Sequence, residues 1–466
     1  MVRSTTLKTQ PPTRRSGTRA TIDTYRSALK YLNSSVNYER QSPKFLGATT
    51  FTLGRIQRLL AALGNPHRTI KTVHIVGTKG KGSTLAMLSS MLQGCGFKVG
   101  AFTSPHILDV RERITVNGSV ASEARFARLM KQVAAASRKP KVGEPTYFEL
   151  LTAVAFLHFA ELKVDIALIE AGLGGRLDST NVIKPEVVGM TSISLDHTLL
   201  LGSTLAAIAK EKSGTFKRGV PVISSPQRED VERVLRNAAS NVDTEIRMTG
   251  KEIAYSCRFE SSRSLGPHSR ICITTPTSRY EHVHAPLLGD HQAINCALAL
   301  GILDVLKERG FEIDDQKAID GLATVTLPGR MEMITDEPRI MVDGAHNAAS
   351  IDATMRAIGQ NIPYDSMVII FGCQKDKDIT GMLKYIRLGA DKVIFTRTGS
   401  PRSADPTDLA AEFSEMSSKM CQVAETLEDA LSIANRAVTR DDLICITGSF
   451  YLVGRAKRLL AKKAKR

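Results

Sequence analysis

The chain has 466 residues and a formal net charge of +16 at neutral pH, and this length allows two or three domains with buried cores. No apolar stretch approaches the roughly 20 residues that a membrane-spanning helix needs, so no membrane partner is expected. The charge suits an anionic partner, either nucleic acid or polyanionic small molecules. Aromatic residues make up only 5% of the chain, which weakens the case for stacking on single-stranded nucleic acid, so we expect small-molecule ligands and no nucleic acid.

The seven cysteines are scattered along the chain, and no pair of them has the spacing of a metal site. An odd number of isolated cysteines is typical of a reducing compartment. We therefore expect a cytoplasmic protein in which most cysteines serve packing.

The first 21 residues contain no acidic side chain and are rich in Ser, Thr and Arg. Such a composition fits a disordered basic arm or an organellar transit peptide. We favour the disordered arm for residues 1–21 because the segment lacks a clear amphipathic apolar face. The folded part of the chain is predicted to start at Ile22.

Strand-like apolar runs alternate with helical patterns along the next 300 residues. The runs lie at residues 72–76, 98–103, 164–170, 187–194 and 220–225. This alternation predicts an α/β fold with a mostly parallel sheet of the P-loop type and helices on both faces. Between residues 249 and 286 the pattern changes to short polar–apolar strands, which predict a small antiparallel insert.

A second series of strand-like runs and helical patterns follows the LPGR segment at residues 327–330. It predicts a smaller, Rossmann-like α/β domain after the first one. We place the domain boundary near Leu327.

A glycine-rich loop stands between the first strand and the helix that follows it. Backbone N–H groups of such a loop, together with the positive end of the helix dipole, bind phosphate. The loop residues are Gly77, Thr78, Lys79, Gly80, Lys81, Gly82 and Ser83. A strict phosphate-loop pattern would need glycine at Ile75 and a hydroxyl at Gly82, so this is a shorter variant. The alternative is a flexible glycine turn with solvated lysines.

Polar residues follow three other strands of the predicted sheet. Glu170 ends one strand, Asp196-His197 is taken to end the next, and Ser104 follows a third. Because the carboxyl ends of parallel strands meet at one sheet edge, these side chains are expected near the phosphate loop. A carboxylate at that edge can hold Mg²⁺.

Several segments together resemble one enzyme family. They are GTKGKGS, FTSPHILDVRERITVNG, TYFELLT, IEAGLGGRLDSTNVI, SLDHTLLLGSTLAAIAKEKSG, LPGRMEM and VDGAHNAAS. In this order and spacing they look like the folylpolyglutamate synthase/dihydrofolate synthase family of the Mur ligase superfamily. The resemblance runs over residues 45–453.

The resemblance implies an ATP- and Mg²⁺-dependent amide ligase that joins L-glutamate to dihydropteroate or to reduced folate through an acyl phosphate. It implies an ATP- and pterin-binding central domain over residues 22–326 and a glutamate ligase domain over residues 327–466. A monomer that acts on small molecules is expected.

The resemblance also implies residue roles. Nucleotide contacts outside the loop fall to Asn295, Arg330 and Asp343, with Lys81 neutralising the β- and γ-phosphates. Ser104, Glu170 and His197 match the family's magnesium ligands, an unusual ligand set for a hard cation. His346 is expected to contact phosphate or the acyl group. Lys212 matches a lysine that is carbamylated in the family. Substrate-binding segments are Thr146, Tyr147, Phe148 and Glu149, then Leu177, Asp178 and Ser179, with Ser449 expected to hold glutamate.

Three questions stay open at this point. Lys79 resembles eukaryotic polyglutamating enzymes, whereas GLGGRLD looks bacterial, so the chain is expected to make dihydrofolate, to extend the glutamate tail, or to do both. A cell-wall Mur ligase would share the loop, Glu170 and His197, although the TSPH and TYFE segments disfavour it. A non-enzymatic nucleotide switch or nucleic-acid binder would not explain LPGR and VDGAHN.

Overall fold

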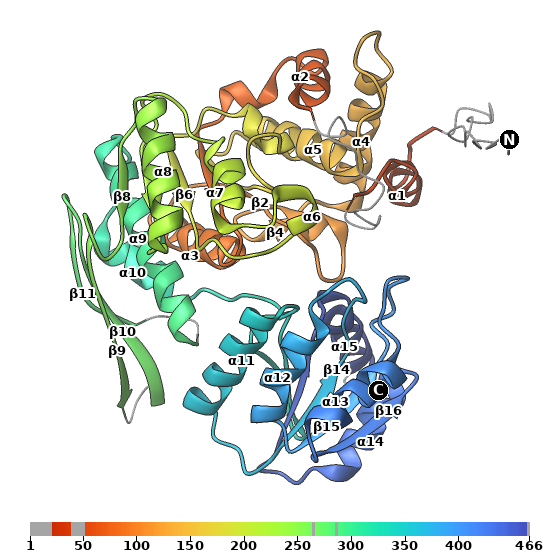
Figure 1. Ribbon diagram of the computed structural model, residues 1–466. Helices are drawn as coiled ribbons and strands as arrows, with labels where there is room; N and C mark the ends of the chain where they lie inside the picture. The colour runs from red at the N-terminus through yellow and green to blue at the C-terminus, as the bar shows by residue number, and fades with distance from the viewer. Residues whose placement is uncertain (1–20, 39–51, 263–265, 285–287, 464–466) are drawn as a thin grey trace, which may run out of the picture.

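The structure is a computed structural model that describes residues 21–38, 52–262, 266–284 and 288–463. Residues 1–20 of the predicted basic arm therefore lie outside the described residues. Figure 1 shows two α/β bodies, one above the other, with a narrow antiparallel sheet at the left edge.

The larger body is built on an eight-stranded sheet with the order β4-β3-β2-β5-β1-β6-β7-β8. The six strands from β2 to β8 pair in parallel, and β3 and β4 form an antiparallel edge. Every residue of the central TVHIV strand is buried, as expected for a strand with helices on both sides. The strands are β1 (Thr72–Val76), β2 (Val99–Phe102), β3 (Ile114–Val116), β4 (Ser119–Val120), β5 (Ile166–Glu170), β6 (Val187–Met190), β7 (Val222–Ser224) and β8 (Ile246–Met248).

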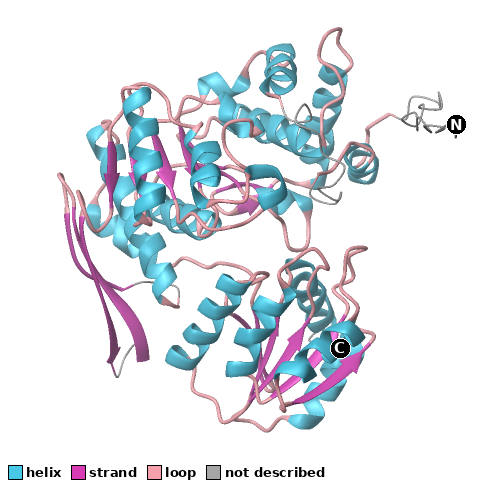
Figure 2. Ribbon diagram, viewed as in Figure 1, coloured by secondary structure: helices cyan, strands magenta, loops and turns pink. Residues whose placement is uncertain are grey.

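Helices cover both faces of this sheet, as Figure 2 shows. Leu88 and Leu300 belong to the apolar cluster on one face, and Leu60 and Phe156 belong to the cluster on the other face. The helices are α1 (Tyr25–Asn33), α2 (Leu53–Ala62), α3 (Lys81–Gly94), α4 (Glu123–Ser137), α5 (Tyr147–Leu162), α6 (Thr198–Leu201), α7 (Leu205–Ser213), α8 (Glu229–Asn241), α9 (Asp290–Glu308) and α10 (Asp315–Ala323). The short 3₁₀ turns are η2 (Pro66–Thr69), η3 (Val110–Arg113) and η4 (Ser179–Val182).

The predicted antiparallel insert is a three-stranded sheet of β9 (Ala254–Ser262), β10 (Gly266–Thr274) and β11 (Arg279–His284), in the order β11-β10-β9. It packs on α9 of the larger body, and β10 also contacts α11 of the smaller body. The insert therefore touches both parts of the chain.

The smaller body has a six-stranded sheet with the order β12-β13-β17-β14-β15-β16, in which only the edge strand β12 is antiparallel. Its strands are β12 (Glu332–Asp336), β13 (Arg339–Val342), β14 (Met367–Phe371), β15 (Lys392–Thr396), β16 (Met420–Ala424) and β17 (Leu443–Thr447). Its helices are α11 (Ala348–Asn361), α12 (Ile379–Gly389), α13 (Pro406–Met416), α14 (Leu427–Ala437) and α15 (Phe450–Lys463). Apolar clusters lie on both faces of the sheet. The predicted fold class, a mostly parallel sheet with an insert followed by a smaller α/β domain, is confirmed.

The carboxyl edges of the two sheets share one cavity. Loops after β1, β2, β5 and β6 line it from the larger body, and loops after β13, β14, β15 and β17 line it from the smaller one. In α/β sheets ligands bind outside the carboxyl ends of parallel strands, so this arrangement positions a binding site between the two bodies.

One predicted strand end is wrong. Strand β6 stops at Met190, and residues 191–196 form a loop that carries Asp196 and His197 over the cavity. Among the helices that the structure describes, none is long and apolar enough to cross a membrane.

Candidate active site

A cavity of about 1410 Å³ lies between the two bodies. Every residue for which the sequence predicts a role in nucleotide, metal or substrate binding, or in catalysis, lines it. Residues more than 300 positions apart, such as Thr78 and Ser449, are thus brought to one site. What each of them binds stays a prediction.

The phosphate loop joins β1 to α3 and holds a tight backbone path. Gly80 is the N-cap of α3 and has a φ of 86°, a left-handed conformation that costs other residues about 1 kcal/mol or more. A Cβ atom there would lie 2.1 Å from Oδ1 of Asn295. The loop is fixed from the other side because Thr78 N–H donates to the carbonyl of Ser192 over 3.0 Å. The helix N-terminus is therefore open toward the cavity.

Replacing Gly80 with alanine should weaken ADP binding at least tenfold, because the new methyl group must displace Asn295 from the loop. Gly96 is the matched control, since it has a φ of 88° but nothing within 4 Å of its Cβ position. Gly96→Ala should show only the backbone cost of about 1 kcal/mol in the free energy of unfolding. Calorimetric titration with ADP and thermal unfolding of both variants test this. Wild-type ADP affinity in Gly80→Ala would contradict it.

Two lysines of the loop, Lys79 and Lys81, and a third beside it, Lys212, lie close together. The ammonium group of Lys81 lies 3.4 Å from the carbonyl of Thr78 and 3.9 Å from Oε1 of Glu170. Lys79 Nζ donates to Oδ2 of Asp196 over 2.7 Å. Lys212 is buried and donates to the carbonyl of Gly77 over 2.7 Å. Desolvation first, and then the charge of Lys81, lower the pKa of Lys212 to about 7.

The predicted metal ligands lie around the same loop. Glu170 ends β5, is 4% exposed, and accepts a hydrogen bond from Ser104 N–H over 3.0 Å. The pKa of His197 is lowered to about 4, chiefly by desolvation where it borders the cavity although half of its side chain is exposed, so its ring is neutral at pH 7, as a metal ligand must be. A buried carboxylate oxygen beside a phosphate loop fits a hard cation. His197 fits a metal site less well than Glu170 does, because its Nε2 atom already lies near a carboxylate, 3.8 Å from Oδ1 of Asp196.

The smaller body contributes several polar groups. Asp343 follows β13 and accepts hydrogen bonds from the N–H groups of Met331 and Ala345, which fixes the turn that carries Arg330. The guanidinium carbon of Arg330 lies 4.7 Å from the centroid of the Phe450 ring. Asp343 and Phe450 therefore fix the LPGR turn, which carries Arg330 into the cavity.

His346 has a defined tautomer. Its Nδ1 lies 2.8 Å from the carbonyl oxygen of Gly344, and because a carbonyl only accepts, Nδ1 carries the proton and Nε2 keeps a lone pair. Burial first, and then the charges of Lys79 and Lys377, lower the pKa of His346 to about 3. The ring is therefore a neutral hydrogen-bond acceptor at pH 7 and not a cationic phosphate contact.

Two remaining predicted residues use their polar atoms locally. Asn295 of α9 donates to Oε1 of Gln292 over 3.0 Å. Ser449 follows β17, is 4% exposed, and accepts a hydrogen bond from Tyr451 N–H at the start of α15. Both side chains keep further hydrogen-bonding capacity toward the cavity.

The predicted substrate pocket is formed by the start of α5 and the loop after β5. Thr146 and Glu149 form a capping box in which each side chain accepts from the other's backbone N–H. The centroids of the Phe148 and Phe102 rings lie 5.5 Å apart, and the tip of the Phe148 ring fills the space beside Gly172, where a Cβ atom would lie 2.5 Å from Cζ. Asp178 is buried and holds Leu173 N–H over 2.7 Å. Of these residues, Phe148 presents an aromatic surface, while Glu149 and Asp178 fix the backbone of the pocket walls through hydrogen bonds.

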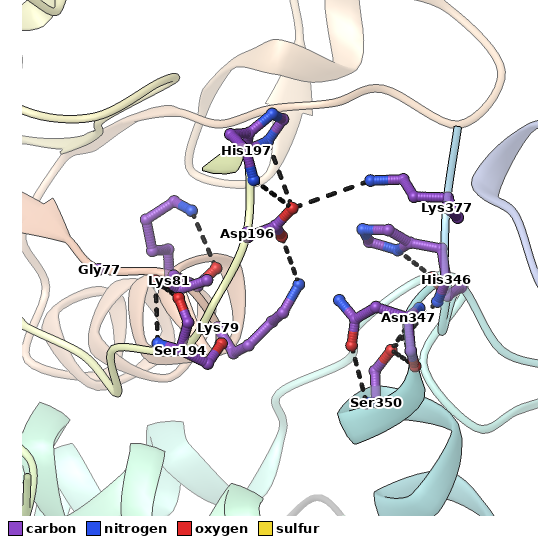
Figure 3. Close-up of polar contacts among 12 residues, drawn as sticks. Gly77, Lys79, Lys81, Ser194, Asp196, His197, His346, Asn347, Ser350 and Lys377 are labelled. Carbon is purple, nitrogen blue, oxygen red and sulfur yellow. Dashed lines mark hydrogen bonds and ion pairs between the residues drawn. The ribbon is translucent and has the colours of Figure 1, made fainter. Parts of the chain in front are cut away.

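Sequence reasoning placed Asp196 at a strand end near the phosphate loop but gave it no role, and it missed two other groups that line the cavity, Arg113 and Lys377. Asp196 lies between Lys79 and Lys377, as Figure 3 shows. Arg113 is 1% exposed and its Nε donates to Nδ1 of His106 over 2.9 Å beside the substrate pocket. Lys377 could have been found because it follows the predicted strand of residues 366–372, at the sheet edge where ligands bind.

Two family descriptions match the chain. Residues 75–303 match the Mur ligase middle domain, and residues 329–450 match the Mur ligase glutamate ligase domain. The phosphate loop and the two sheets therefore define a Mur ligase.

The chain is 34% identical over 413 residues to the Dihydrofolate synthase/folylpolyglutamate synthase of Bacillus subtilis, covering 88% of this chain and 94% of the relative. Among solved structures, Mycobacterium tuberculosis Folylpolyglutamate synthase complexed with ADP superimposes with a TM-score of 0.83 at 30% identity, over 94% of this chain and 98% of that one. E. coli FolC in complex with DHPP and ADP also gives 0.83, at 26% identity, over 96% and 100%. The chain belongs to the dihydrofolate synthase/folylpolyglutamate synthase family and is an ATP-dependent ligase.

Proposed function

We propose that this enzyme joins L-glutamate to dihydropteroate and also extends the glutamate tail of tetrahydrofolate. The observation that carries the proposal is the single cavity between the two sheets, which the phosphate loop, the Phe148 pocket and the edge of the smaller sheet all line. In this proposal residues 22–326 bind ATP and the pterin, and residues 327–466 bind glutamate. The folate names of the relatives do not favour a cell-wall ligase.

The phosphate loop is proposed to bind the triphosphate. The N–H groups at the start of α3, which no side chain caps, and the ammonium group of Lys81 line the cavity, and Asn295, Arg330 and Asp343 border the space for the nucleoside. Support comes from the solved relatives that hold ADP. We propose that Ser104, Glu170 and His197 hold Mg²⁺, which when bound neutralises phosphate charge.

The substrate carboxylate needs activation because oxide is not a leaving group. Transfer of the terminal phosphoryl group of ATP to a carboxylate oxygen releases ADP and forms an acyl phosphate. The amine of glutamate then attacks the acyl carbon and phosphate leaves. The residues' part is to position the reactants and neutralise charge, and the two bodies exclude water that would hydrolyse the acyl phosphate.

His346 is proposed to accept a hydrogen bond from the attacking amine. Its Nε2 lone pair lies in the cavity wall on the side of the smaller body. Ser449, on the neighbouring strand end, is proposed to contact the incoming glutamate. Phe148 is proposed to stack on the flat pterin, a role supported by the relative that holds DHPP together with ADP.

Product analysis tests the proposal. Purified enzyme should release ADP and phosphate only when Mg²⁺, ATP, L-glutamate and a reduced pterin carboxylate are all present. Mass spectrometry should detect one added glutamate on dihydropteroate and a ladder on tetrahydrofolate. A product from one acceptor alone would restrict the enzyme to one activity. No product from either, in folded protein that binds ADP, would contradict the proposal. A cytoplasmic monomer remains the expectation from the sequence.

A further inference from the structure

Lys377 is a cation of the smaller body that points into the site of the larger one. It lies in the loop between β14 and α12, and its Nζ is 3.8 Å from Oδ1 of Asp196, which belongs to the loop after β6. Figure 3 shows Lys377 and His346 on one side of the cavity, with Lys79 and Asp196 facing them. The pair therefore joins the two bodies at the level of the phosphate loop.

The contact with Asp196 does not satisfy Lys377. Its side chain is only 19% exposed, yet among the interactions of the described residues its ammonium group has this ion pair and no hydrogen bond, since 3.8 Å is too long for one. Asp196 in turn does not need Lys377. Its Oδ2 accepts from Lys79 over 2.7 Å, and its Oδ1 accepts from the N–H of His197 over 3.0 Å.

The charges around the loop are also unbalanced. Lys79, Lys81 and Lys377 are three cations, whereas the carboxylates beside them are two, Asp196 next to Lys79 and Lys377 and Glu170 at 3.9 Å from Lys81. A mostly buried cation without a hydrogen bond, beside a site with excess positive charge, is suited to bind an oxyanion.

We propose that Lys377 contacts an oxyanion of the reactants, and that this oxyanion belongs to the phosphoryl group during its transfer. The proposal rests on the proposed function. The bond between the terminal phosphorus and ADP breaks while the bond to the carboxylate oxygen forms, and Lys377 gives up no proton. Its position opposite Lys79 favours the phosphoryl group over the second possible source, a carboxylate of the incoming glutamate. Asp196 holds Lys377 close to this position.

Three variants test the role of Lys377. Lys377→Met removes the charge, Lys377→Arg keeps it, and Lys375→Met is the matched control because Lys375 is exposed and lies outside the cavity wall. In Lys377→Met, ADP affinity should stay within about threefold of wild type while kcat falls about 10²- to 10³-fold, the usual effect of losing one transition-state contact. Lys377→Arg should recover much of this loss, and Lys375→Met should match wild type.

Two further measurements identify the oxyanion. In single turnover with saturating pterin substrate, the ADP burst should be slowed in Lys377→Met. A normal burst with a raised KM for L-glutamate would assign Lys377 to the amino-acid carboxylate and overturn the phosphoryl assignment. Calorimetric titration with ADP plus aluminium fluoride, a phosphoryl mimic, needs no acceptor, so it can compare the variants even if wild-type enzyme converts neither folate substrate.

Binding of ADP plus aluminium fluoride tests the role of Lys377 separately from the proposed folate substrates. Weaker binding of ADP plus aluminium fluoride, with ADP binding unchanged, supports the role of Lys377 even where the proposed substrates fail. Wild-type turnover and wild-type binding of the mimic in Lys377→Met would overturn it. Equal loss of ADP binding in Lys377→Met and Lys377→Arg would also overturn it, because the pair with Asp196 would then be purely structural.

Discussion

Lys81→Ala is expected to abolish ADP formation and to leave the fold intact. The Lys81 side chain is 16% exposed, and its contacts are a 3.4 Å hydrogen bond to the Thr78 carbonyl and a 3.9 Å ion pair with Glu170. Neither contributes much to stability, and Lys212 nearby gains from the loss of a like charge. The same ammonium group is aimed at the space above the loop, where the transferred phosphoryl group gains charge. Losing such a contact costs about 3–4 kcal/mol of transition-state stabilisation.

The measurement is ADP release in single turnover, together with the thermal midpoint of unfolding. Lys184→Ala provides a control, because Lys184 is exposed and does not line the cavity. We expect a fall of at least 10²-fold in the rate for Lys81→Ala and none for the control. If Lys81→Ala turns over at the wild-type rate while it is folded, the phosphate-loop interpretation is wrong.

The fold was largely predictable from local patterns. Buried parallel strands such as TVHIV are short apolar β-branched runs, and helices with one or two apolar faces separate them. The hairpin of β3 and β4 was missed because its strands have three and two residues and are partly exposed, too short for a periodic pattern. The end of β6 was placed too late because TSIS continues the β-branched run although its backbone leaves the sheet after Met190.

The candidate site was predictable where a residue follows a strand or belongs to a quoted motif. Glu170 and Ser104 lie at the carboxyl edge for that reason. Lys377 and Asp196 were not connected, because they are 181 positions apart and approach only through the packing of the two bodies. Arg113 was not singled out either, because a charged residue in a polar segment is normally predicted to be exposed. Only the structure shows that Arg113 is buried beside His106.

Lys212 presents a buried amine that is ready for modification. Its Nζ is held by the carbonyls of Gly77 and Gly174, at 2.7 and 3.5 Å. Desolvation first, and then the charge of Lys81, lower its pKa to about 7. About half of the molecules therefore carry a neutral amine at neutral pH, and only the neutral amine can attack CO₂. The attack forms an N–C bond and releases a proton, which leaves a carbamate anion beside the cations of the loop.

We expect Lys212→Ala to lose activity by at least 10²-fold, because the site loses an anion that balances its lysines. Lys210→Ala is the matched control on the same helix, since Lys210 is exposed. Acetate or another short carboxylate should restore part of the activity to Lys212→Ala and none to Lys81→Ala. In wild-type enzyme supplied with ¹³C-labelled CO₂, the carbamate NMR signal should fall as pH drops below about 7, because protonation removes the neutral amine tenfold per pH unit. Full activity of Lys212→Ala, or a signal that persists in that variant, would show that Lys212 is not the modified residue.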